Sequence, residues 1–188
     1  MLLYVNSVDF PDAYYSWTPH FRRIVVPNDA SIQQVVDWIK QAAIRHGTIR
    51  RIVINSHGLP GEVYIGQGLN INNVDLLSGL RPYMQPMVSE QEINRDTGIL
   101  IDACLVASGS GRNQNIGTMV CEPGTGYEFL WKMAIAINNK VLAAFNVQFS
   151  PGAGGSDSSG IEGPHVLFGP RGVLKVVDRA YTGDMNCG

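Results

Sequence analysis

Short apolar runs alternate along the chain with segments of helical periodicity. The runs stop at prolines, glycines or polar corners, which is typical of strands in an α/β protein. They predict strands at residues 2–5, 22–26, 50–55, 99–101, 140–149, 166–168 and 173–177. The run at 99–101 shows no polar alternation, so we expect a strand buried on both faces, as in the interior of a parallel sheet.

The clearest helix signal comes after Ser31. Ser31 and Gln34 have the spacing of a capping box, and the apolar residues beyond them recur on one helical face. Gly47 predicts the end of this helix, because glycine adopts the left-handed cap conformation without strain.

Two more segments predict helices. Thr125 and Glu128 form a second capping box ahead of apolar residues with helical spacing. Asn73 is expected to cap a shorter helix, and Pro82 is expected to break the chain after it, since proline supplies no backbone N–H. Together with the strands, these helices predict one domain over residues 1–188, an α/β three-layer sandwich around a mainly parallel sheet of about six strands.

Composition narrows the classes of function. The chain has 188 residues, 45% hydrophobic and 16% charged, which fits one globular domain with a full core. Its net charge of −2 gives no electrostatic basis for binding nucleic acid or anionic membranes. The sequence shows neither a membrane-spanning apolar run nor a signal peptide pattern, so we expect a cytoplasmic chain or part of a larger secreted protein.

Two of the expected strands end in residues with catalytic chemistry. The strand at 50–55 is followed by His57, and the strand at 99–101 is followed by Cys104. Open α/β sheets bind their ligands at the carboxyl edge of the strands. If the two strands are parallel neighbours, His57 and Cys104 emerge at the same edge and can face each other.

A histidine beside a cysteine can carry out nucleophilic catalysis. A thiol is mostly protonated at neutral pH, and an adjacent imidazole can take its proton during attack and return it to a leaving amine. The developing oxyanion needs two donors, and we expect these to be the backbone N–H groups of Gly58 and Cys104. His57 and Cys104 are therefore the candidate catalytic residues.

Asp102 lies two residues before the candidate nucleophile, and this spacing in a strand puts both side chains on one face. In one interpretation its carboxylate binds a cationic substrate side chain, which favours Arg or Lys before the scissile bond. In the other, Asp102 caps the following turn, a common role of aspartate at a strand end. The residues alone leave both interpretations open.

The other cysteines and histidines predict no metal site and no cofactor. Cys121 and Cys187 lie in polar segments, and the sequence has no Cys-x-x-Cys or His-x-x-x-His spacing. The glycine-rich stretch at 150–164 lacks the Gly-Lys-Ser/Thr of a phosphate-binding loop and predicts a flexible loop at the same sheet edge. We expect surface or capping positions for the remaining histidines, His20, His46 and His165.

The order strand, Ser56-His57-Gly58, strand, Asp102-Ala103-Cys104 resembles the caspase-like (caspase–hemoglobinase) fold of cysteine peptidases. That group includes caspases, legumains, gingipains, separases and the clostripain family. The motif from Asp102 to Ala107 is most similar to the clostripain-type Asp-Ala-Cys signature. A broader similarity, over about residues 50–149, is to an uncharacterised caspase-like domain of large bacterial surface proteins.

This resemblance implies a cysteine endopeptidase that cleaves a protein or peptide substrate after Arg or Lys. It makes His57 the general base, Cys104 the nucleophile and Asp102 the acid linked to a basic P1 residue. Many relatives also mature by self-cleavage in an exposed loop. The alternative is a catalytically silent caspase-like module that binds a partner protein.

Overall fold

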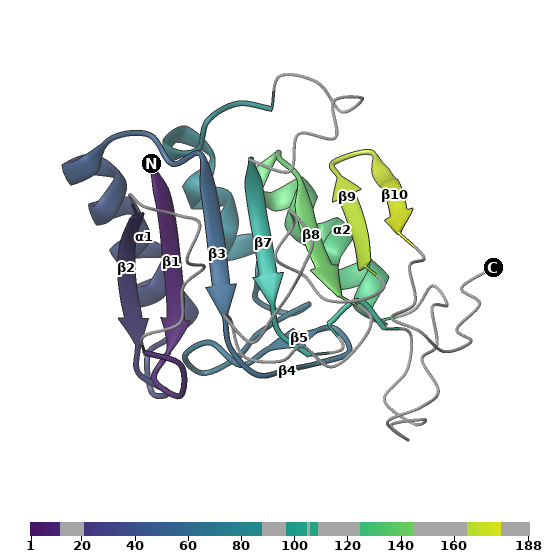
Figure 1. Cartoon of the computed structure of the whole chain (residues 1–188), viewed down its shortest axis with the longest axis horizontal. Coiled ribbons are helices and arrows are strands. Elements are labelled where there is room, and N and C mark those ends of the chain that lie inside the picture. Colours follow the sequence, from purple (N-terminus) through teal and green to yellow (C-terminus); the bar gives the residue numbers. More distant parts are fainter. Residues whose placement is uncertain (12–20, 88–96, 105, 109–124, 145–164, 178–188) are drawn as a thin grey trace.

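The computed structural model describes residues 1–11, 21–87, 97–104, 106–108, 125–144 and 165–177. Within these residues, seven strands form one large sheet in the order β10-β9-β8-β7-β3-β1-β2 (Figure 1). The strands are β1 (Leu2–Ser7), β2 (Phe21–Val26), β3 (Arg51–Asn55), β7 (Gly98–Asp102), β8 (Val141–Ala144), β9 (His165–Gly169) and β10 (Gly172–Val177).

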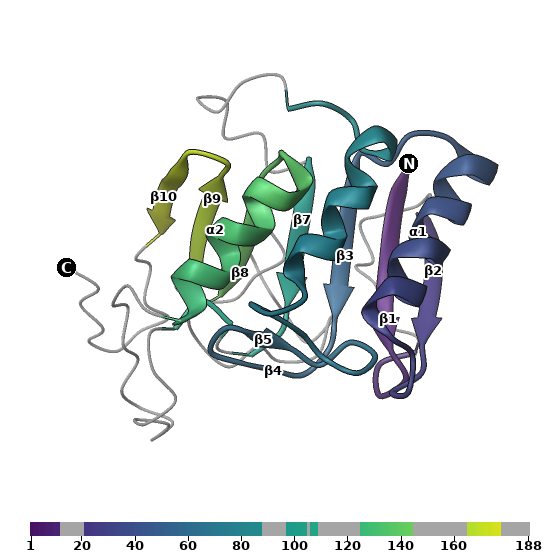
Figure 2. The ribbon, with the colours of Figure 1, turned by 180° about the vertical axis from the view of Figure 1, so that it is seen from behind.

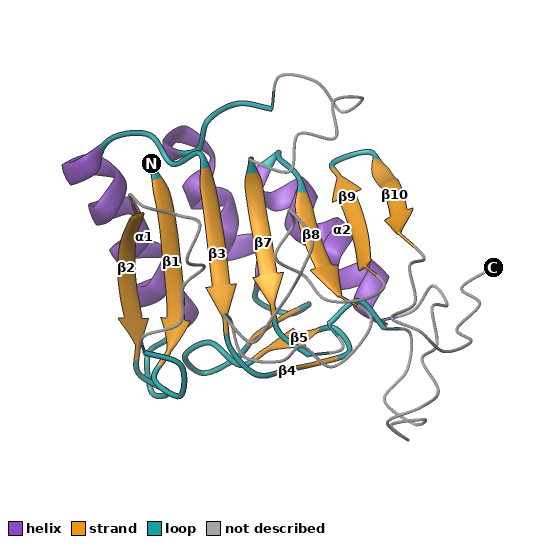
Figure 3. Cartoon of the chain, viewed as in Figure 1, coloured by secondary structure: helices purple, strands orange, loops and turns teal. Residues whose placement is uncertain are grey.

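The large sheet is mostly parallel. Neighbouring strands are paired in parallel along the order β2-β1-β3-β7-β8. The hairpin of β9 and β10 adds two antiparallel pairs, β8 with β9 and β9 with β10, at one side. The arrowheads of the parallel strands therefore lie along a single edge of the sheet (Figure 3). This confirms the expected mainly parallel sheet, with seven strands in the described residues instead of about six.

One face of the sheet is covered by helices. α1 (Ile32–His46), the 3₁₀ helix η1 (Val74–Tyr83) and α2 (Thr125–Ile137) all lie on this face (Figures 1 and 2). The main core fills the space between these helices and the strands, and a smaller buried cluster of strand residues lies on the opposite face. The described residues thus supply a sheet and one helical layer, and the three-layer arrangement stays a prediction.

The caps of α1 agree with the sequence. The backbone N–H of Gln34 donates to Ser31 Oγ at 3.2 Å, and the N–H of Ser31 donates to Gln34 Oε1 at 2.8 Å, which confirms the capping box. Gly47 has a φ of 93°, and its N–H donates to the carbonyl of Ala43 at 2.8 Å. α2 begins at Thr125 itself, and Glu128 lies in its first turn.

Three smaller predictions differ from the structure. Asn73 is the N-cap residue of η1, as expected, but its side chain makes no cap hydrogen bond; it instead bridges the N–H of Asn70 and the carbonyl of Gly68, and so closes the preceding turn. Pro82 lies inside η1 without ending it, next to the last residue, Tyr83. His165, expected at the surface or in a cap, is buried in β9.

Several expectations fall outside the described residues. These are the flexible loop at 150–164, residues 145–149 of the strand expected at 140–149, and the positions of His20, Cys121 and Cys187. No helix in the described ranges combines the length and the apolar composition that crossing a membrane requires.

Candidate functional site

The structure places the two candidate catalytic residues after neighbouring strands. β3 and β7 are parallel, and Asn55 is the register partner of Asp102 at their carboxyl ends. The ladder continues for one more hydrogen bond, from the N–H of Ser56 to the carbonyl of Asp102 at 3.3 Å. His57 and Cys104 therefore each follow the last register pair by two residues, at the same edge of the sheet.

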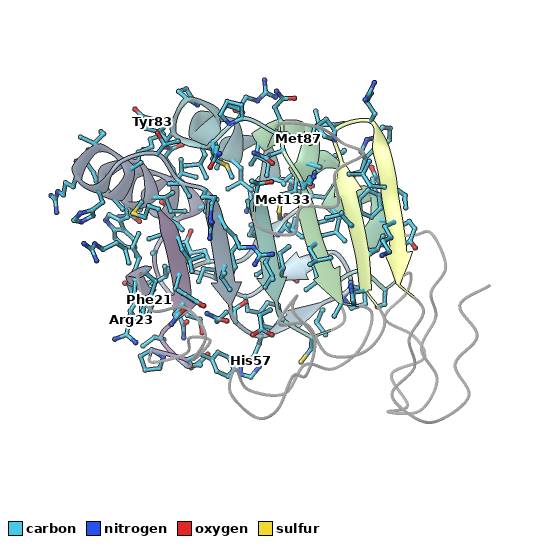
Figure 4. The ribbon with its side chains drawn as sticks, turned by 45° about the horizontal axis from the view of Figure 1, so that its top comes forward. Phe21, Arg23, His57, Tyr83, Met87 and Met133 are labelled. Atoms are coloured by element: carbon cyan, nitrogen blue, oxygen red, sulfur yellow. The ribbon has the colours of Figure 1, made fainter. Side chains whose placement is uncertain are left out.

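The switch point of the sheet lies on this edge, next to the pair of strands that carries the candidate residues. The chain passes from β1 to β2 in one direction across the sheet, whereas from β3 onward it runs through β7 and β8 in the other. In open α/β sheets the ligand crevice lies outside the carboxyl ends of the strands at which the order reverses, here β1 and β3. Figure 4 shows His57 at this edge, opposite the one with Tyr83 and Met87.

Gly58 lies against the backbone of the Cys104 segment. A Cβ at residue 58 would stand 2.9 Å from the carbonyl oxygen of Cys104 and 2.7 Å from Val106 Cγ2. Real Cβ atoms essentially never approach a neighbour so closely, so glycine is required for this approach. The two segments expected to supply the oxyanion donors are thus in direct contact.

The small hairpin after His57 determines where the N–H of Gly58 points. β4 (Gly58–Leu59) pairs with β5 (Glu62–Val63), which in turn pairs with β6 (Leu69–Asn70). The N–H of Tyr64 donates to the carbonyl of His57 at 2.9 Å, so Gly58 and Val63 form a non-hydrogen-bonded pair. In such a pair the N–H points away from the partner strand, so β5 does not use the donor of Gly58.

His57 has a fixed backbone and an exposed side chain. Its carbonyl accepts hydrogen bonds from the N–H of Tyr64 and, at 2.8 Å, from Ser56 Oγ. Its imidazole makes no hydrogen bond to another described residue, but the ring of Phe10 packs edge-on against it. The two ring centroids are 4.8 Å apart and the ring planes are inclined by 62°.

Cys104 is a half-buried cysteine in the turn after β7. The residues after it are tied to three neighbouring elements. The carbonyl of Val106 accepts from the N–H of Gly61 at 3.1 Å, and the N–H of Ala107 donates to the carbonyl of Ala144 in β8 at 3.0 Å. Gly126 in α2 packs against the same stretch, since a Cβ there would stand 2.5 Å from the carbonyl oxygen of Val106.

Asp102 is the last residue of β7, with 6% of its surface exposed. Alternation along the strand places its side chain on the face of Leu100, which belongs to the cluster opposite the helices. Because the strand ends at Asp102, alternation does not extend to Cys104, and a shared face for the two side chains stays a prediction.

Asp102 and two asparagines form a row of polar residues across neighbouring strands of the sheet, called the polar row below. Asn6 in β1, Asn55 in β3 and Asp102 in β7 are consecutive register partners, and all three are buried. Asn55 Nδ2 donates to Asn6 Oδ1 at 2.6 Å, and Asn6 Nδ2 donates to the carbonyl of Pro11 at 3.3 Å. The sheet edge beside His57 therefore contains a chain of buried amides that leads to the segment carrying Phe10.

Phe10, Asn6 and Asn55 are not among the residues predicted from the sequence. Asn6 and Asn55 do carry a recognisable signal, because each is a polar residue that directly follows a run of apolar residues. Burial of an amide requires hydrogen-bond partners, which indicates a specific network. Phe10 has no such signal, because it lies in a turn whose fold depends on contacts with distant strands.

The described residues contain no group of three or more His, Cys, Asp or Glu side chains suited to hold a metal ion. What their arrangement offers is a thiol, an exposed imidazole and a glycine N–H at one edge. No protein-family model matches the chain, and no curated protein matches it.

Proposed function

We propose that this chain is a caspase-like cysteine endopeptidase in which His57 is the general base and Cys104 the nucleophile. The observation that carries the proposal is the register of β3 and β7, which gives both residues the same offset from the pair Asn55 and Asp102. Adjacent parallel strands lie about 4.8 Å apart, so residues at equal offsets begin within reach of each other. The strand order also supports the proposal, because His57 follows β3, one of the two strands at the switch point.

The chemistry is that of an acyl transfer to sulfur. Cys104 Sγ attacks the carbonyl carbon of the peptide bond while His57 takes the thiol proton. The N–H groups of Gly58 and Cys104 stabilise the resulting oxyanion. When the intermediate collapses, the C–N bond breaks, His57 gives its proton to the leaving amine, and a thioester forms on Cys104. Water, deprotonated by His57, then hydrolyses the thioester and releases the acid product.

Asp102 is proposed to select a basic P1 residue. Its buried carboxyl group lies in the polar row directly beside the turn that carries Cys104. A carboxylate in such a position forms strong, charge-assisted hydrogen bonds with a guanidinium or ammonium group. The substrate class is therefore a protein or peptide with Arg or Lys before the scissile bond.

The test is covalent labelling with acyloxymethyl ketone peptides that carry Arg, Lys or Asp at P1. We expect an adduct on Cys104, located by mass spectrometry, with the Arg and Lys probes but not with the Asp probe. The adduct should be absent in Cys104→Ala and strongly reduced in His57→Ala. His46→Ala is a matched control, since His46 is an exposed histidine at the end of α1.

Thiol reactivity separates this proposal from the catalytically silent alternative. If His57 and Cys104 form a dyad, iodoacetamide should alkylate Cys104 faster in the wild-type protein than in His57→Ala. Equal alkylation rates in the two proteins, together with no ketone adduct, would refute the dyad and favour a protein-binding module.

A further inference from the structure

We propose that Phe10 is a positioning residue that holds the imidazole of His57 in the orientation needed for proton transfer. This inference rests on the proposed function of His57. A catalytic base is generally oriented by a third group, which in many hydrolases is a carboxylate. Here no described residue forms a hydrogen bond with the imidazole, and the packed group is an aromatic ring, 4.8 Å away between centroids.

The contact matters because the side chain of His57 is exposed and its backbone is not free to move. Two hydrogen bonds to its carbonyl fix the main chain, which leaves rotation of the side chain as the remaining freedom. An edge-on aromatic contact favours the orientation in which the two rings meet over orientations in which they do not. The ring of Phe10 therefore favours one orientation of the imidazole.

Phe10 is itself held in place from both sides. Its N–H donates to the carbonyl of Ser7 at 3.0 Å, and Ser7 Oγ accepts from the N–H of Asp9 at 3.2 Å. On the other side, the carbonyl of Pro11 accepts from Asn6 Nδ2. The turn that carries Phe10 is thus anchored to the end of β1 before and after the aromatic residue.

The amide orientations in this anchor are dictated by chemistry. The carbonyl of Pro11 can accept but not donate, so Asn6 must present its NH₂ group to Pro11 and its Oδ1 to Asn55. Asn55 must then present its own NH₂ group to Asn6. The hydrogen bonds thus link Asn55 to Asn6 and Asn6 to Pro11. The neighbouring residue, Phe10, contacts the ring of His57, which lies two residues after Asn55.

The test compares Phe10→Leu with Phe10→Tyr. Leucine keeps an apolar side chain but removes the ring, and tyrosine keeps the ring. We expect Phe10→Leu to lower kcat about tenfold with KM within about twofold, and Phe10→Tyr to restore most of kcat. Phe21→Leu is the matched control, because Phe21 forms a similar edge-on pair with Tyr4, with centroids 5.0 Å apart, away from the site.

Proton NMR of the imidazole gives a readout that does not depend on activity. We expect the His57 ring signals, assigned with His57→Gln, to shift in Phe10→Leu because the ring current is lost, and to stay in place in Phe21→Leu. Unchanged His57 signals in Phe10→Leu would overturn the role of Phe10. If the wild-type protein is active, an unchanged kcat in Phe10→Leu would overturn it as well. If the wild-type protein shows no turnover that depends on Cys104, the proposed function is overturned instead. A shift of the His57 signals in Phe10→Leu would still establish the contact between Phe10 and His57.

Discussion

The Cα of Gly58 packs so closely on the carbonyl of Cys104 that a Cβ at residue 58 would stand 2.9 Å from that oxygen. This approach joins the segment after the candidate base to the segment after the candidate nucleophile. The alternation of strands and helices does not require it. It is a property of the site, and it can be tested directly.

Gly58→Ala should reduce both activity and stability. The new Cβ would meet the carbonyl of Cys104 and Val106 Cγ2, and the backbone at Cys104 cannot move without displacing the thiol. We expect a loss of about 1–3 kcal/mol in the free energy of unfolding and at least about a tenfold fall in kcat/KM. Denaturant unfolding and peptide turnover measure the two effects.

Gly79→Ala is the control for this substitution. Its Cβ would approach the flexible end of the Lys40 side chain at 3.1 Å, and Lys40 can move aside. Activity and stability should both stay near those of the unmodified chain. Equal activity of Gly58→Ala and Gly79→Ala would contradict an oxyanion site at Gly58.

Asp102→Asn distinguishes the two interpretations of this carboxyl group. If the carboxylate binds the P1 side chain, kcat/KM for Arg substrates should fall about 10²-fold, and the preference for Arg over an uncharged P1 residue should disappear. If Asp102 caps the turn, the melting temperature should fall while the P1 preference persists. Asp75→Asn, at an exposed site in η1, should change neither quantity.

Asn6→Ala should destabilise the fold through the buried amide chain. The substitution removes the acceptor of Asn55 Nδ2 and the donor to the carbonyl of Pro11. A buried polar group left without its partner costs about 1–3 kcal/mol, so we expect a clear decrease in the denaturant midpoint. Asn72→Ala, which truncates an exposed asparagine, serves as the reference and should stay within about 0.5 kcal/mol.

Ser31→Ala tests stability without involving the site. It removes the acceptor of the Gln34 N–H at the start of α1, which should lower the free energy of unfolding by about 1 kcal/mol. Peptide turnover at a temperature well below the melting point should be unchanged. A large loss of turnover would mean that α1 influences the site in a way that the described contacts do not include.

Tyr127 predicts a loss of stability at alkaline pH. Burial raises the pKa of its phenol above the ordinary value of 10.0. The unfolded chain therefore releases this proton at lower pH than the folded chain, so stability falls as the pH rises from about 10 toward the folded pKa. Tyr127→Phe should flatten this part of the stability curve, as measured by urea unfolding between about pH 9 and 11.

The features that depend on neighbouring residues can be predicted from the sequence. The capping box of Ser31 and Gln34 and the glycine end of α1 are local, and both are confirmed. So are the strands that end before His57 and Cys104, because each apolar run and its polar corner are contiguous. Parallel pairing of the two strands is the condition for bringing these residues to one edge, and the structure meets it.

The features that the sequence does not predict depend on residues far apart in the chain. Asn6 and Asn55 are 49 residues apart, and their hydrogen bond exists because β1 and β3 pair in one particular register. His165 is a polar residue at the start of a short run flanked by proline and glycine, which suggests a surface position, but pairing of β9 with β8 buries it. A local pattern carries no information about such a register, so these contacts depend on the assembled sheet.

The strand order also determines when, during synthesis, the backbone after Cys104 can form its hydrogen bonds to the rest of the sheet. β7 lies between β3, which is synthesised earlier, and β8, which is synthesised later. The N–H of Ala107 reaches its acceptor on Ala144 only after β8 has joined the sheet. As the chain leaves the ribosome, His57 and its hairpin thus come first. The segment after Cys104 can form the hydrogen bond from Ala107 to Ala144 only after α2 and β8 have been synthesised.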